Sequence, residues 1–267
     1  MASVSTSMPA VTFTRPNPFP ICFKEAKYEF LKCLRLPMYA VSIMLFPIMF
    51  YILFGLVMGR QTINGISTTV YLIPAYGTFG VMGASLFGTA ATLATDRGFG
   101  WLQVKKASPM PIYAYFLAKL VMSMIFSTAD VLMLLALGFA FGGVHLAPLV
   151  AVKLVLTLVS GSLPFCAMGL AIGYFAGPTS APAVINIFYL PMSFCSGLWM
   201  PFMFLPKFIQ KIAVFLPPYH LSQLAFRQVG FGQSGPSLWH WESLAGFALI
   251  CLGVAWVGHQ RDQKANG

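Results

Sequence analysis

The sequence contains very little charge. Only 8% of its 267 residues are Asp, Glu, Lys or Arg, whereas soluble domains carry about 25%. Hydrophobic residues make up 58% of the chain, and the mean hydropathy is +0.79. These values exclude a soluble domain of this length and predict an all-α polytopic membrane protein.

Carboxylates are especially scarce, and the motifs of common enzymes are missing. The six Asp and Glu residues are too few for paired acid–base catalysis. The chain has no Gly-x-x-x-x-Gly-Lys-Ser/Thr phosphate loop, no His-Glu-x-x-His, no Gly-x-Ser-x-Gly and no Cys-x-x-Cys. We therefore expect no catalytic residues, no metal and no cofactor on this chain. The net charge of +10 belongs to the flanks of apolar stretches, so no nucleic-acid partner is expected.

Long apolar stretches predict six transmembrane helices, because about 20 apolar residues cross a bilayer as one helix. The apolar centre of the sixth, Leu244–Val257, is short unless residues from Trp239 onward extend it. The predicted spans cover about 38–58, 70–93, 112–141, 149–175, 183–199 and 239–259.

The N-terminal region differs from the rest of the chain, which forms one transmembrane domain over 37–267. Residues 1–18 are rich in Ser, Thr and Pro and predict a flexible tail. Over 19–36, apolar residues recur at helical spacing between lysines, which is typical of an amphipathic helix at the membrane interface. A helix packed on a soluble partner domain is the alternative, and both can hold at once.

The distribution of positive charge predicts the orientation. Of the 16 Lys and Arg residues, ten fall on the side of the two termini, five fall on the opposite side, and Lys119 lies inside the third span. Because cytoplasmic flanks carry the excess of Lys and Arg, both termini are predicted to be cytoplasmic.

Asp130 lies within the third predicted span. A carboxylate at membrane depth is costly and is by default a candidate for function. The alternative is a hydrogen bond to Ser127, Thr128 or a neighbouring helix. If Asp130 is functional, it and Lys119 would suit a proton- or ion-coupled secondary carrier, which is the alternative to the function inferred below.

The cytoplasmic loop 94–111 combines charged and apolar residues in a short turn. A solvated loop would rarely place large apolar side chains together, so we interpret this loop as a docking site for a partner, oriented by its charges. Its candidate residues are Asp96, Arg97, Gly98, Phe99, Trp101, Leu102, Ser108 and Pro109.

Between Pro178 and Arg227 the chain is apolar but broken by six further prolines. Broken backbone at membrane depth survives only where protein or a water-filled cavity covers it. This pattern predicts a helix leading into a re-entrant hairpin at 200–216, on the side of the membrane opposite loop 94–111.

Two stretches resemble type-2 ABC transporter permeases. Residues 96–119 are similar to the Glu-Arg-x-x-Gly-Thr-Leu…Ser-Pro…Gly-Lys stretch of that family, and residues 194–227 are similar to its C-terminal signature. The six-span layout with an N-terminal amphipathic helix extends the likeness to nearly the whole chain. Three positions depart from the family pattern. Asp96 stands in place of the usual Glu, Phe99-Gly100 stands near the position of the usual Thr with a shifted register, and Pro217 stands in place of the usual Asn. These differences leave the subfamily open.

The resemblance implies the membrane subunit of an exporter, with two permease copies, expected to be identical, and two separate ATPase subunits that hold ATP and Mg. Loop 94–111 would then be the coupling helix, in a prokaryotic plasma membrane. The first, second and fifth spans would face the dimer axis and line a path that includes Phe50, Phe54, Tyr76, Phe188, Tyr189 and Phe194. The outer gate would include Ser196, Gly197, Pro201, Pro206, Pro218 and Arg227. Without a large domain between the first two spans, the cargo expected is an amphiphile, a lipid- or drug-like molecule or a lipid-linked glycan.

Overall fold

The computed structural model describes residues 18–35, 37–57, 62–63, 66–107, 112–231 and 235–266. This part of the chain is a bundle of helices with one two-stranded antiparallel ribbon, β1 (Thr62–Ile63) and β2 (Ile66–Ser67). The first half contains α1 (Pro18–Leu34), α2 (Pro37–Phe50), η1 (Tyr51–Val57), α3 (Thr68–Leu86), η2 (Phe87–Ala91), α4 (Thr92–Gly98), α5 (Trp101–Ala107) and α6 (Ile112–Phe141). The second half contains α7 (Pro148–Ser160), α8 (Leu163–Phe175), α9 (Ala181–Cys195), η3 (Phe202–Phe204), α10 (Lys207–Ala213), α11 (Pro217–Gln228) and α12 (Ser237–Asn266).

Four helical segments of the described chain are long and apolar enough to cross a membrane. They are Thr68–Gly98, Tyr113–Phe141, Pro148–Phe175 and Ser237–Lys264. Met44–Val57 and Ala181–Cys195 are shorter apolar helices at the positions of the first and fifth predicted spans. The prediction of an all-α membrane protein is confirmed, while the count of six spans stays a prediction. The 15 residues of α9 extend only about 22 Å, against a hydrocarbon core of about 30 Å.

Two predicted spans differ in detail from the helices observed. The fourth is divided into α7 and α8 at Gly161 and Ser162, just before Pro164 at the start of α8. Leu221 of α11 lies so close to Gly161 that a Cβ there would be 2.2 Å from its methyl carbon. The helix at the last predicted span, α12, is longer than predicted. It begins at Ser237 and continues through polar residues to Asn266.

The segment α3–η2–α4 is the buried centre of the bundle. In its most apolar stretch 89% of the residues are buried, against 22% in the corresponding stretch of α12. Helix α3 contacts α2, α6, α8 and α11. Small residues permit these contacts: a Cβ on Gly169 would lie 1.8 Å from Thr89 Oγ1. Such close approach of helices across small residues is typical of membrane bundles.

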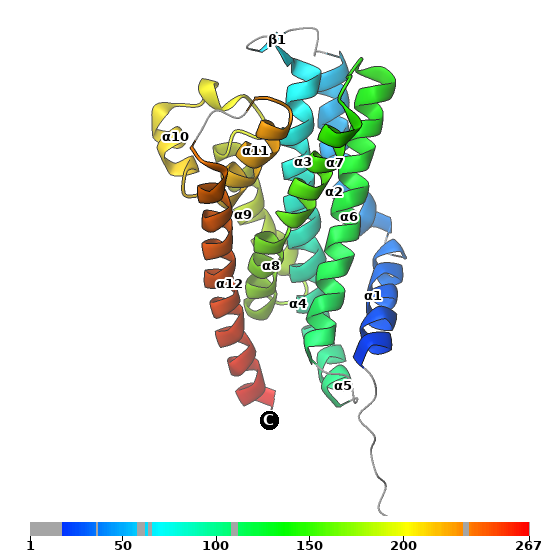
Figure 1. Cartoon of the computed structure of the whole chain (residues 1–267). Coiled ribbons are helices and arrows are strands. Elements are labelled where there is room, and N and C mark those ends of the chain that lie inside the picture. The colour runs from blue at the N-terminus through cyan, green and yellow to red at the C-terminus, as the bar shows by residue number, and fades with distance from the viewer. Residues whose placement is uncertain are drawn as a thin grey trace, which may run out of the picture.

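The two ends of the bundle carry different elements (Figure 1). The start of α1, the short helix α5 and the end of α12 lie at one end, which we call the α5 end. The ribbon β1–β2 and the α10–α11 region lie at the opposite end. Helix α1 runs alongside α6, where the rings of Phe30 and Phe126 are 5.6 Å apart.

The proline-broken segment folds into three short helices after α9. Helix α9 ends at Cys195, and Gly197 turns the chain with a positive φ of 75°, a conformation that glycine adopts without steric cost. The chain continues through η3 and α10 to α11, whose residues from Pro217 to Phe226 are all buried. Helix α11 contacts α3, α7 and α12. The re-entrant path of this segment through a membrane stays a prediction.

Candidate functional site

The turn between α4 and α5 presents a small apolar surface at the α5 end. Phe99, Trp101 and Val104, which we call the exposed tip, have exposed fractions of 69%, 56% and 61%. Leu102 points inward instead and is buried against Tyr115 and Tyr174. The loop was expected to offer all of its large apolar residues to a partner. Phe99 and Trp101 do face outward, whereas Leu102 holds α5 to the bundle. Ser108 and Pro109 lie outside the described residues.

Gly98 and Gly100 permit the turn that places this tip. A Cβ on Gly98 would lie 2.0 Å from the ring of Pro178, so the turn packs closely on the chain that leads to α9. Gly100 has a positive φ of 76°, a left-handed conformation that favours glycine. The close contact at Gly98 and the left-handed turn at Gly100 together place α5 beside the chain that leads to α9.

Asp96 is buried at the centre of a network of charges. Its carboxylate accepts from Lys32 Nζ of α1 at 2.6 Å, from the Tyr115 hydroxyl at 2.7 Å and from Lys119 Nζ at 3.2 Å. Lys119 is itself fully buried and also donates to Thr92 Oγ1 at 2.8 Å. These bonds tie α4 to α1 and α6.

The network continues from Lys119 to α1 and back to α5. Lys119 Nζ lies 3.4 Å from Glu29 Oε2, and Lys105 Nζ donates to Glu29 Oε1 at 3.1 Å and to Glu25. Burial alone would raise the pKa of Glu29, but the surrounding lysines outweigh it and hold this pKa below its ordinary value of 4.5. We call Glu29, Lys32, Asp96, Lys105 and Lys119 the charge cluster.

Arg97 makes a second set of contacts in the opposite direction. Its guanidinium donates to Asp262 of α12 at 2.9 and 3.0 Å, and to the carbonyl oxygens of Gly173 and Tyr174 at 2.9 and 2.6 Å. These carbonyls belong to the last turn of α8, which lacks intrahelical partners and favours a cation. Arg97 therefore joins α4 to α8 and α12.

Asp96 and Arg97 do not face outward, although the sequence analysis expected their charges to orient a docking partner. Both are engaged within the chain and hold the α4–α5 turn on four helices. This network was not predicted from the sequence. One signal was available: four of the six carboxylates in this acid-poor chain belong to it, namely Glu25, Glu29, Asp96 and Asp262.

The residues expected to line a path are only partly brought together. Phe50 lies 6.1 Å from Tyr76 and 5.0 Å from Trp199, and Tyr189 stacks on Phe79 at 4.7 Å, all measured between ring centroids. We call these five residues the aromatic cluster. Phe54 stacks on Phe50 at its edge. Phe188 and Phe194 are exposed, and Phe188 lines a groove on another face of α9.

The expected gate residues are distributed along the proline-broken segment. Ser196 is buried, and its hydroxyl has no hydrogen-bond partner in the described chain. Pro201 precedes η3, Pro206 precedes α10, and Pro218 is buried in the first turn of α11. Arg227 is half-buried near the end of α11. None of these residues lines the groove between α8, α9 and α12.

Asp130 is fully buried against α3. A Cβ on Gly80 would lie 1.7 Å from its Oδ2 atom, so the carboxyl group occupies space that only glycine leaves open. Neither of its oxygens has a hydrogen-bond partner among the described residues. The Thr128 hydroxyl donates to the Met124 carbonyl instead, and Ser127 is likewise unpartnered there.

The fold and this site define an integral membrane protein with a small exposed apolar surface at one end, held to the bundle by buried charges. The sequence profile of the family "ABC-2 type transporter" matches residues 24–228. The chain belongs to the ABC-2 type transporter family, as the resemblance in its motifs indicated. It is the membrane permease of an ABC transporter, a transport subunit whose family works with an ABC ATPase.

A relative in Bacillus subtilis (strain 168) agrees with this assignment. The protein named "Putative transport permease YvfS" is 25% identical over 209 residues, which cover 78% of this chain and 85% of that protein.

Proposed function

We propose that this permease exports an amphiphilic, lipid-like or drug-like molecule or a lipid-linked glycan, and that the exposed tip is its contact with the ATPase. Two identical permeases and two ATPases would assemble, with both termini in the cytoplasm of a prokaryotic cell. ATP and Mg would be held by the ATPase subunits. The observation that carries this proposal is that the exposed tip is joined to the bundle by the charge cluster and by Arg97 with Asp262. We call these buried and half-buried charges the brace.

The brace explains how motion could pass from the tip into the membrane. Phe99 and Trp101 offer the aromatic surface that dominates protein–protein contacts. Asp96 and Arg97, three and two residues before Phe99, connect the same turn to α1 and α6 on one side and to α8 and α12 on the other. A displacement of α5 would therefore move these helices together, as a rigid-body transition requires.

The test compares Trp101→Ala with Trp256→Ala, which removes a similarly exposed tryptophan from α12. Loss of a central aromatic contact costs about 2 kcal/mol or more, roughly 30-fold in affinity. Trp101→Ala should weaken binding of the ATPase by that factor and reduce ATP-dependent flux in proteoliposomes, whereas Trp256→Ala should change neither. Unchanged affinity and flux in Trp101→Ala would contradict the proposal.

A proton- or ion-coupled carrier remains the second candidate, because Asp130 is buried without a hydrogen-bond partner in the described chain. The structure weakens its chemistry, since Lys119 is engaged by Glu29 and Asp96 rather than by Asp130. Transport that continues in ATP-depleted membranes and is abolished by Asp130→Asn would establish the carrier and overturn the ATP-driven exporter.

A further inference from the structure

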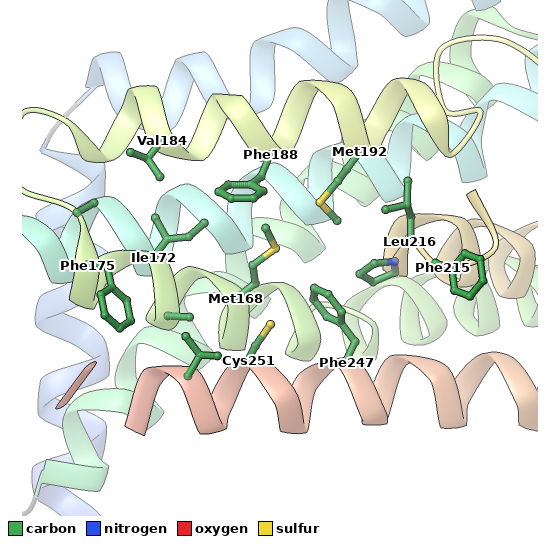
Figure 2. Close-up of a pocket in the computed structure, with 14 residues that line it drawn as sticks. Met168, Ile172, Phe175, Val184, Phe188, Met192, Phe215, Leu216, Phe247 and Cys251 are labelled. Carbon is green, nitrogen blue, oxygen red and sulfur yellow. The ribbon is translucent and has the colours of Figure 1, made fainter. Parts of the chain in front are cut away.

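An apolar groove separate from the aromatic cluster lies between α8, α9 and α12 (Figure 2). Its volume is about 460 Å³, and its fourteen lining residues carry no charged or amide side chain. Figure 2 shows side chains from the three helices converging on this space. They include Met168, Ile172, Phe188, Met192, Phe247 and Cys251.

Along α8 and α9 the groove is no longer than one membrane leaflet is thick. It follows α9 from Val184 to Met192 and α8 from Met168 to Phe175, which is about 10–12 Å at 1.5 Å per residue. Half of a bilayer's hydrocarbon core is about 15 Å. Phe215, with Leu216 and Pro217, lies at the end remote from Phe175 (Figure 2). The groove therefore suits an occupant that stays in one leaflet rather than one that crosses.

The end at Phe175 borders positive charge. The guanidinium carbon of Arg261 lies 5.9 Å from the centroid of the Phe175 ring, and Lys264 follows one turn later on α12; both side chains are exposed. The acidic neighbour Asp262 is already engaged by Arg97. A negatively charged group at this end would thus meet cations.

We propose that the groove binds one acyl chain of an anionic phospholipid, with its phosphate group beside Arg261. The lipid would come from the leaflet at the α5 end of the bundle. The apolar walls alone cannot select it, because a chain in the bilayer is already in an apolar medium. Selectivity must come from the headgroup, at about fivefold for each basic side chain near the surface. The inference does not depend on export, because binding is measured without ATP or cargo.

The test measures the lipid that stays on the full-length permease after extraction from membranes of equal phosphatidylglycerol and phosphatidylcholine. We expect phosphatidylglycerol to be enriched about fivefold or more, and Arg261→Gln to remove most of that enrichment. Lys24→Gln, which removes an exposed cation from α1, is the charge control and should leave it unchanged. Equal retention of the two lipids by the wild type would overturn the proposal.

A second pair of variants tests the groove itself. Val184→Trp places a ring in the groove and should reduce retained phospholipid several-fold. Ile187→Trp adds the same ring at a position of α9 that is 67% exposed and outside the groove, and should not. A photo-crosslinking residue at Phe188 should label lipid. Labelling of a second permease copy instead, or equal retention in the two tryptophan variants, would overturn the proposal.

Discussion

Replacing Lys119 by methionine removes a cation from the interior of the charge cluster with little change of volume. Lys119 is fully buried, and its ammonium contacts Glu29, Thr92 and Asp96. Removing one partner of a buried ion pair costs about 3–5 kcal/mol, because the other charge stays buried without compensation. Since Lys32 still pairs with Asp96, and Lys105 with Glu29, we expect a loss near the lower value, about 3 kcal/mol.

The assay is thermal unfolding of the purified permease in detergent. In a chain of this size, 1 kcal/mol corresponds to about 2–4 °C in Tm, so Lys119→Met should lower Tm by about 6–12 °C. Adding Asp96→Asn to Lys119→Met should recover part of this loss, because Asp96 keeps only Lys32 as a cationic partner once Lys119 is replaced, and the second change removes that buried carboxylate. Lys24→Met, at an exposed position of α1, should leave Tm unchanged. A Lys119→Met protein as stable as the wild type would refute the network as a structural brace.

Three further predictions concern the interior, the pH response and the opposite end. Gly80→Ala should destabilise the bundle by about 1–3 kcal/mol through overpacking, and Asp130→Ala should rescue it, because the atom that collides is Asp130 Oδ2; failure of the rescue in unfolding experiments would mean that α3 and α6 do not meet there. The low pKa of Glu29 in the folded state gives stability that is present above pH 4.5 and is lost as pH falls through the lower folded-state value. Tm should therefore fall more steeply between pH 6 and 3 in the wild type than in Glu29→Gln, and parallel curves would contradict this. Replacing Lys207 and Lys211 together by Gln should alter export of anionic cargo in vesicles; identical flux for every cargo would make them simple interfacial anchors.

Much of the bundle follows from apolar run length. Helix α6 occupies the residues predicted for the third span, because a long apolar run with no internal break can bury its backbone polar groups only as one helix. The end of α12 was less predictable. The helix continues past Val257 to Asn266, where Asp262 is held by Arg97, and hydropathy carries no record of that contact.

The role of the charged turn could not be read from adjacency in the sequence. Asp96 and Arg97 are consecutive, and from the sequence both were expected to orient a docking partner. On a helix, however, consecutive side chains point about 100° apart. Asp96 therefore reaches α1 and α6, and Arg97 reaches α8 and α12. The exposed tip was recognisable because Phe99 and Trp101 are large apolar residues in a loop, whereas the groove depends on how α8, α9 and α12 pack.

Photo-crosslinking from the exposed tip to the ATPase tests the central claim most directly. A benzophenone side chain replaces Trp101 in one variant and Leu149 in another, in cells that contain the whole transporter. Leu149 is 64% exposed at the start of α7, at the end of the bundle opposite α5. The account predicts crosslinking to the ATPase from position 101 and none from position 149. Crosslinking from position 149, or from neither position in a transporter that still hydrolyses ATP, would contradict it.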